Sequence, residues 1–515
     1  MLKILKLTLF SLIISFIPLT THATTYYFSF SEGDDSNDGL SEGAPFKTVT
    51  KLSQIMDNMV AGDVALLKRG DVWEPANTQN ISGPCMGCTV DVYGSGDAPY
   101  IQAIHSDSVF FYLNNSDGWT FKNFTTHCYT GSAGFSWSFF LFNGTSDIMF
   151  DDVQVDNCTH GVYSNGNESD LNGTSANRRI TVKNSRFNYN GGAGWLGGGG
   201  GDFVIHNNTY TYNGWEHPFL NHSIYWSYWD GGRITNNKTF HSNSGGSEVA
   251  VTSVSKASTA VVTVTGHGYT TGDYVYFVDS ADMWEINHHR FQITVLDADT
   301  FELDGVNSTT YNTFVTGNVL KDSEVCSGAI FVGHGYGDEV YFGYNKLYED
   351  PDTAGASCWG MPWDAAYAPE RGNEQFTNMT VEGNILSNLG NVYFGMGNTG
   401  TARFNFNRIY HDNNKTFIRG FYDATQAQDP GLQNNDVIAQ YNLVVVTDDS
   451  GNDLNLTAGM DFSSTDNAEA KNNYFFFGDT ANVPCTIGRI GEFTQTDNVC
   501  IEGSSFTDST IHTTE

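Results

Sequence analysis

Positive charge is scarce in this chain of 515 residues, which has 24 Lys and Arg against 58 Asp and Glu and a formal net charge of -34. A protein this acidic repels phosphate unless its few cations are gathered in one place, so we expect no nucleic-acid partner. The composition is rich in Gly, Asn, Thr, Tyr and Phe, which are poor helix formers, and this argues against a helical bundle. Aromatic residues make up 14% of the chain, enough to bury a large core, which excludes a disordered protein.

Long apolar runs are absent beyond the N-terminus. Residues 1–23 combine Lys3 and Lys6 with an apolar stretch over 7–19 and end in the small residue Ala23, as secretory signal peptides do. The apolar stretch is shorter than the ~20 residues needed to span a bilayer. We therefore expect cleavage, export to the extracellular or periplasmic space, and no membrane contact afterwards.

Familiar catalytic motifs are missing as well. The chain has no G-x-S-x-G nucleophile motif and no H-E-x-x-H zinc motif. A run of glycines over 197–201 lacks the Lys-Ser/Thr that a phosphate loop requires, so we interpret it as a wide turn or as a place where substrate approaches the backbone. Function must then come from residues that the fold brings together.

A short strand-like phrase with Asn or Asp near its centre recurs through the chain. Most spacings between successive members are 23 to 39 residues, and one, from Asn237 to Asn345, is 108. One strand-turn-strand unit cannot bury its apolar face alone, whereas stacked units can. A column of Asn would stabilise one corner of such a stack, because each amide can bond the next. The alternative is a β-sandwich with Asn-rich turns. The eleven members are Asn123, Asp152, Asn184, Asn208, Asn237, Asn345, Asn384, Asn407, Asn442, Asn473 and Asn498.

The repeat resembles the right-handed parallel β-helix of the pectin-lyase-like superfamily. The segment over 26–49 is similar to the start of many secreted β-helix proteins, and 48–60 has apolar residues at helical spacing. In that superfamily such a helix caps the open first coil, and 62–71 then looks like the first strand. The resemblance implies an all-β fold, a right-handed parallel β-helix of about eleven coils with an N-terminal capping helix.

The long gap between Asn237 and Asn345 indicates an insertion. Its clean alternating strands and its G-H-G-Y-x-x-G-D phrase resemble a small β module inserted in phage-tail and bacterial surface proteins. We give the module a binding or spacer role, and we interpret its His267, His288 and His289 as turn and surface residues. The expected organisation is a signal peptide (1–23), a first β-helix part (24–246), the inserted β module (247–322) and a second β-helix part (323–515).

The eight cysteines suit disulfides in an exported protein. A zinc site is the alternative, but paired C-x-x-C motifs and nearby His are missing. The expected pairs are Cys85 with Cys88, Cys128 with Cys158, Cys326 with Cys358, and Cys485 with Cys500. The D-D-S-N-D-G phrase over 34–39 is like half a calcium loop, but Pro45 stands where the final Glu should be, so we expect a turn. The many carboxylates leave Ca²⁺ binding open elsewhere, and no other cofactor is expected.

Reactive and aromatic side chains gather in three turns that follow successive strands. Aligning these strands places Tyr228, His334 and Asp364 in one column beside several Trp, which predicts a site, although a ridge of polar turns is the alternative. The catalytic candidates are His334, Tyr228, Arg371, Asp364 and Asp338. The substrate-binding candidates are Trp226, Trp229, Asp230, Tyr336, Trp363 and Tyr367.

Three functions remain open, all with an extended polysaccharide as partner and a monomeric protein. A lyase acting on a uronate needs a base, His334 or Tyr228, and a cation such as Arg371. This is the function we expect first. A glycoside hydrolase needs two carboxylates, such as Asp338 with Asp364 or Asp230, and an adhesion protein needs neither.

The few cations cluster in two regions, which could form subsites for an acidic polymer or simply balance an acidic surface. They are Arg178, Arg179, Lys183 and Arg186 in one coil, and Arg403, Arg408, Lys415 and Arg419 in another pair of coils.

Overall fold

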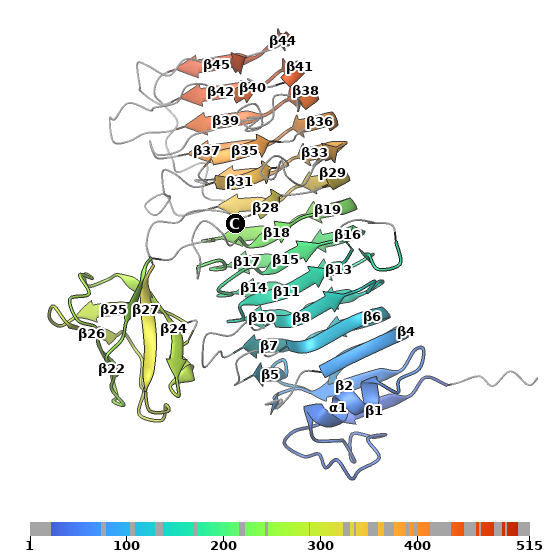
Figure 1. Ribbon diagram of the computed structural model, residues 1–515, viewed down its shortest axis with the longest axis vertical. Helices are drawn as coiled ribbons and strands as arrows, with labels where there is room; N and C mark the ends of the chain where they lie inside the picture. Colours follow the sequence, from blue (N-terminus) through green and yellow to red (C-terminus); the bar gives the residue numbers. More distant parts are fainter. Residues whose placement is uncertain are drawn as a thin grey trace, which may run out of the picture.

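A rod of stacked coils forms most of the molecule (Figure 1). A coil has three strands, as in β18 (Ile224–Trp226), β19 (Trp229–Thr235) and β20 (Lys238–Phe240). Each strand pairs in parallel with its equivalent in the next coil, so that β18 pairs with β28 (Ile330–Gly333) and β19 with β29 (Tyr336–Gly343). The fold is therefore an all-β parallel β-helix, as predicted. The structure, a computed structural model, describes residues 22–73, 79–103, 109–128, 137–167, 173–215, 222–242, 246–287, 289–322, 330–333, 336–348, 359–364, 375–387, 391–395, 399–411, 434–446, 460–462, 465–477, 487–489 and 492–502.

The three stacks of strands are named here the first, second and third faces, after the order of β18, β19 and β20 within a coil. The first corner joins the first face to the second, the second corner joins the second face to the third, and the third corner leads to the next coil. The third face has thirteen strands among the described residues, more than the eleven coils predicted. The excess arises because the coils of β3 (Val72–Trp73) and β5 (Tyr100–Ala103) lack the Asn or Asp phrase that was counted in the sequence.

One α-helix, α1 (Val49–Met56), closes the N-terminal end of the rod (Figure 1). The Thr48 side chain caps it by accepting a hydrogen bond from the Lys51 amide, and Asp35 in turn accepts bonds from the Thr48 amide and hydroxyl. Its apolar face is buried against the first coils. The helix is shorter than the 48–60 expected, and the 34–39 segment is a turn that holds this cap in place. No described helix is both long and apolar enough to cross a membrane.

A ladder of buried Asn side chains follows the second corner. The backbone N–H and Nδ2 of one Asn donate to Oδ1 of the Asn in the next coil, with distances of 2.9–3.0 Å for Asn237 to Asn345. Nδ2 also donates to a strand carbonyl, Ile205 O at 2.9 Å for Asn237, so every polar atom of the amide has a partner. The ladder joins Asn208, Asn237, Asn345, Asn384, Asn407, Asn442, Asn473 and Asn498.

Three residues assigned to this ladder from the sequence lie one position earlier. Asn123, Asp152 and Asn184 have φ values of 65°, 56° and 54° and form the left-handed turn just before the ladder position. Ser185 occupies the ladder position in its coil, where its amide donates to Asn208 Oδ1 at 2.8 Å. The prediction is therefore wrong for these three members and confirmed for the other eight.

Two of the four expected disulfides lie in the described residues, and both are present. Cys85 bonds Cys88, and Cys128 bonds Cys158. The other two pairs cannot be placed, because Cys326, Cys358 and Cys485 lie outside the described residues.

The insertion forms a separate antiparallel sheet of seven strands, which projects from the rod (Figure 1). It begins with β21 (Glu248–Ala250) and ends with β27 (Thr316–Lys321), which pair with each other. Its own core contains Val262, Phe277 and Phe301, all fully buried. The two ends of the module are adjacent, since the Gly246 amide donates to the Lys321 carbonyl at 2.8 Å.

The module packs against the third corner of the rod. Trp215 of the rod stacks on Tyr276 of the module, with ring centroids 4.7 Å apart. Asp322, at the return to the rod, is bonded by His241 at 3.2 Å and by Arg290 at 2.6 Å. Burial alone would raise the pKa of Asp322, but these two partners hold it below its usual range. The module is thus held by an aromatic stack and by a buried carboxylate.

His289, which was interpreted from the sequence as a turn or surface residue, is instead half-buried against the rod, where we expect it to make the interface sensitive to acid. Nε2 of His289 lies 3.2 Å from Nδ2 of Asn157 in the rod, and burial lowers the pKa of His289 to about 4. The unfolded chain binds a proton at this residue below about pH 6.5, whereas the folded protein does so only near 4. We therefore expect stability to fall between pH 6.5 and pH 4, and His289→Gln to reduce that fall.

The melting temperature, measured from pH 7 to pH 4, checks this expectation. His267→Gln is the matched control, because the contacts that the structure describes for this histidine, with Tyr269 and Phe301, lie within the module. Equal slopes against pH for the wild type and His289→Gln would contradict the prediction.

Candidate functional site

An outward-facing aromatic patch covers the first face of the lower coils. Tyr112, Phe140 and Tyr163 occupy the same position in β6 (Val109–Lys122), β8 (Trp137–Phe142) and β11 (His160–Asn165). Their ring centroids are 5.1 and 4.9 Å apart, and Trp137 stacks on Tyr163 at 5.7 Å. All four side chains are half-buried, so each leaves part of a ring exposed for the apolar face of a sugar. The sequence did not reveal this patch, because outward and inward aromatics alternate in these strands.

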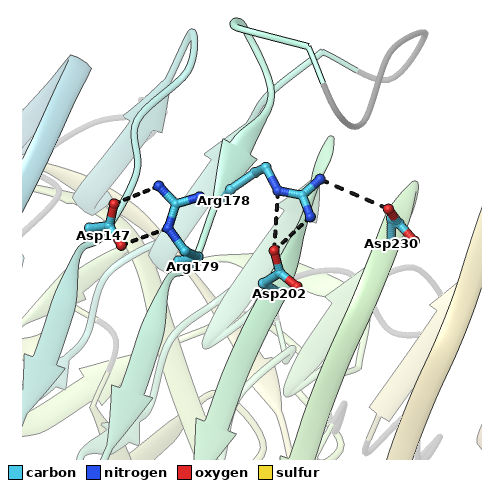
Figure 2. A network of polar contacts seen from close by, with 5 residues as sticks. All are labelled: Asp147, Arg178, Arg179, Asp202 and Asp230. Carbon is cyan, nitrogen blue, oxygen red and sulfur yellow. Dashed lines mark hydrogen bonds and ion pairs between the residues drawn. The ribbon is translucent and has the colours of Figure 1, made fainter.

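A row of carboxylates and arginines runs along the first corner (Figure 2). Arg179 grips Asp147 with Nε at 2.7 Å and Nη2 at 2.5 Å. Arg178 donates from Nε at 3.2 Å and Nη2 at 2.6 Å to Asp202, and its Nη1 is 3.9 Å from Asp230 Oδ2. Both guanidinium groups thus pair with acids of neighbouring coils, so Arg178 and Arg179, which were predicted as possible subsites for an acidic polymer, are neutralised in the structure.

At the lower end of this row the pKa values of two neighbouring carboxyl groups are shifted in opposite directions. The hydrogen bonds from Arg179 hold the pKa of Asp147 below its usual range. Burial, and then the neighbouring Asp147, raises the pKa of Asp117. Asp117 therefore keeps its proton to a higher pH than Asp147.

At the upper end, Asp230 and Asp338 are side by side. They are Cα partners in β19 and β29. Asp230 is also the partner of Gly201 in the coil below, and Gly201 is the partner of Arg178 in the coil below that. Asp338 Oδ1 accepts bonds of 2.9 Å from the Glu339 amide and from Asn378 Nδ2. Neighbouring strands are ~4.8 Å apart, so the backbones of these two half-buried aspartates lie at about that separation.

Two of the predicted sugar platforms are not on the surface. Trp226 and Trp229 are 0% exposed and pack on each other edge to face, with ring centroids 4.1 Å apart. The prediction that they bind substrate is therefore wrong. Both point inward, although they are three residues apart, because Tyr228 between them has a left-handed backbone with φ of 52°.

The predicted column of three reactive residues is out of register by one. Val332 pairs with Trp363, so Gly333 pairs with Asp364, and Asp364 is therefore aligned with the residue before His334. The alignment of Tyr228, His334 and Asp364 in one column is wrong for Asp364.

Of the remaining candidates, Tyr228, Tyr336 and Trp363 lie within the described residues. Tyr228 is half-buried, and its carbonyl accepts bonds from the Gly199 and Gly200 amides. Tyr336 and Trp363 belong to strands β29 and β31 (Trp359–Asp364). His334, Tyr367 and Arg371 lie outside the described residues, as do Lys415 and Arg419.

The glycine run at 197–201 has a structural cause. A Cβ at Gly198 would collide with the Ser227 carbonyl, and one at Gly200 with the Asn177 carbonyl. Backbones of neighbouring coils approach each other here, which requires glycine. In the described part of the chain, no three His, Cys, Asp or Glu side chains are grouped as a metal site.

No family model matches the chain. A segment of 89 residues, 17% of the chain, is 36% identical to a lacto-N-biosidase of Bifidobacterium longum subsp. longum, and the match spans only 5% of that protein.

Among solved structures, similar ones include a GH136 lacto-N-biosidase from Eubacterium ramulus (13% identity, 92% of this chain and 68% of that one, TM-score 0.47). Others are a rhamnogalacturonan lyase (13%, 84% and 84%, TM-score 0.34) and an endo-xylogalacturonan hydrolase from Aspergillus tubingensis (9%, 92% and 100%, TM-score 0.34).

Proposed function

We propose that this protein is a carbohydrate-active enzyme that hydrolyses glycosidic bonds in an extended glycan. The observation that carries the proposal is the side-by-side placement of Asp230 and Asp338 in adjacent coils at the first corner. Their strands are ~4.8 Å apart, close to the ~5–5.5 Å between carboxyl groups that retaining glycosidases use. The name of the relative that shares an 89-residue segment is also that of a glycosidase.

The two carboxyl groups receive different roles from their neighbours. Asp230 lies beside the Arg178 guanidinium, whose positive charge suits a carboxylate that attacks the anomeric carbon. Asp338 is then the proton donor to the leaving oxygen and later the base that activates water. Arg178 and Asp202 orient the pair, and the glycan lies along the first face, where Tyr112, Phe140 and Tyr163 present their rings.

A polysaccharide lyase is the second candidate, favoured by the half-buried Tyr228 two residues before Asp230. Tyr228 or His334 would remove the C5 proton of a uronate, and Arg371 would neutralise its carboxylate. We also propose that the enzyme is secreted and monomeric, and the two disulfides among its described residues suit an oxidising compartment.

Product analysis distinguishes the two reactions. The protein is incubated with uronate-containing, sulfated and neutral polysaccharides and with neutral oligosaccharides. We expect new reducing ends without a rise in ultraviolet absorbance, because hydrolysis leaves no double bond. Reducing ends accompanied by the absorbance of unsaturated uronates would show a lyase, and neither signal on any substrate would refute both.

A further inference from the structure

The second corner changes character along the rod. The residue before each ladder position has a left-handed backbone, which Asn and Asp tolerate and bulky side chains rarely adopt. Below the module this residue is always Asn or Asp, but above it three are aromatic. Residues held in such a strained backbone conformation are concentrated at functional sites. The corner residues, with φ, are Asn123 (65°), Asp152 (56°), Asn184 (54°), Asn207 (55°), Asn236 (57°), Tyr344 (59°), Gly383 (67°), Phe406 (58°), Tyr441 (57°), Asn472 (55°) and Asp497 (53°).

The three aromatic side chains are exposed and nearly continuous. Tyr344 is 53%, Phe406 51% and Tyr441 45% exposed, so they contribute little to the core. The rings of Phe406 and Tyr441 are parallel within 4°, with centroids 5.0 Å apart. In the coil between Tyr344 and Phe406 the corner residue is Gly383, where a Cβ would lie 2.6 Å from Tyr344 Cε1. The Tyr344 ring thus extends over Gly383, and aromatic surface spans four coils.

Cations flank the same corner in an otherwise acidic protein. Lys238 and Lys346 are Cα partners in β20 and β30 (Lys346–Tyr348), and like charges directly opposite each other in a sheet repel. Arg408 lies two coils above Lys346 in the same column, and Arg403 precedes Phe406 on the second face. The ion pairs within the described part of the chain include none of these four.

We propose that these residues form a second glycan-binding site, a corner strip made of Tyr344, Phe406 and Tyr441 with Lys238, Lys346, Arg403 and Arg408. Its ligand is an acidic glycan chain that lies along the rod axis. Sugar rings offer apolar faces to aromatic side chains, and carboxylate or sulfate groups pair with the cations. A polymer fits because the aromatic and cationic side chains recur along the rod at whole multiples of the ~4.8 Å spacing between coils.

The strip is separate from the proposed catalytic pair. The second corner joins the second face to the third, whereas Asp230 and Asp338 lie at the first corner. The strip therefore holds long chains without taking part in bond cleavage, and its binding does not depend on the proposed reaction.

Replacing the three aromatics with Asn tests the strip, because Asn is the residue that the lower coils use at this corner. The Tyr344→Asn/Phe406→Asn/Tyr441→Asn variant should melt no lower than the wild type and should bind polygalacturonate, alginate or heparin about tenfold more weakly. Lys238→Gln/Lys346→Gln should weaken the same binding and reduce its dependence on salt. Phe30→Asn, at a 42% exposed phenylalanine outside the strip, is the control and should bind as the wild type does.

Binding is measured by affinity electrophoresis with each polymer in the gel and with dextran as the neutral comparison. It is repeated in the Asp338→Asn background, so that loss of binding and loss of catalysis are observed separately. Wild-type affinity in the triple variant, or no retention of the wild type by any acidic polymer, would overturn the proposal. So would a wild-type dimer that the triple variant abolishes, because the strip would then be covered by a second copy.

Discussion

Asp338→Asn is expected to lower kcat on the cleaved glycan by about 10²–10⁴-fold, the usual contribution of a general acid-base group. The amide cannot give a proton to the leaving oxygen, yet its size and its ability to accept bonds from the Glu339 amide are kept. Asp230→Asn should cause a loss of at least similar size, because it removes the nucleophile. Initial rates of reducing-end release, with KM determined separately, check both.

Asp152→Asn is the matched control for these variants. Asp152 is exposed at the second corner, with φ of 56°, and Asn is the residue that equivalent coils use there. The same change of charge should leave kcat unaltered. If Asp230→Asn and Asp338→Asn both fold and retain wild-type kcat, the catalytic pair is incorrectly assigned.

Asn345→Ala is expected to lower the free energy of unfolding by about 4 kcal/mol or more. The amide of Asn345 accepts two bonds from Asn237 and donates to the Ile234 carbonyl and to Asn384 Oδ1. Its removal leaves several buried polar atoms unpaired, at about 1–3 kcal/mol each. Values this large are exceptional for one substitution and point to a buried network.

A variant at a neighbouring corner residue distinguishes the contribution of the ladder to stability from that of the turn. Asn236→Ala changes a left-handed, exposed residue and should cost only about 1–2 kcal/mol. Denaturant unfolding of both variants gives the comparison. A loss for Asn345→Ala no greater than that for Asn236→Ala would show that the ladder adds little stability.

The sequence predicted the ladder but not its register in every coil. Asn-Asn pairs such as Asn236-Asn237 place one Asn in the turn and one in the ladder, and the sequence phrase cannot distinguish them. Where only one Asn is present, as at Asn184, that Asn lies in the turn if the preceding strand ends directly before it. It lies in the ladder if the strand ends one residue earlier than that. A shift of one residue in the register of a strand exchanges its inward-facing and outward-facing side chains. The same uncertainty about register caused the wrong alignment of Asp364.

The inward Trp residues show why the site was harder to predict than the fold. Alternation along a strand would place Trp226 and Trp229 on opposite sides, but the left-handed Tyr228 resets the alternation at the first corner. Such a turn is not evident from a Tyr in the sequence, since Gly, Asn and Asp are the residues that normally mark it.

The acids of the first corner were missed for a different reason. Asp147 lies 32 residues before its partner Arg179, and Asp202 lies 24 residues after Arg178. Coil lengths vary, so no fixed spacing in the sequence identifies neighbours across coils. The sequence shows that Arg178 and Arg179 are adjacent, but the carboxylates that neutralise them could be identified only from the way the strands stack.

The ladder bond across the module is indistinguishable from the others. Asn237 and Asn345 are separated by 108 residues and Asn384 and Asn407 by 23, yet their amide bonds are 3.0 and 2.9 Å long. Because the module leaves and rejoins the rod at adjacent residues, the coils register with one another regardless of what the chain does in between. The third corner is therefore a permissive point for genetic insertion. Whole domains can be gained, lost or exchanged there during evolution while the rod folds as before.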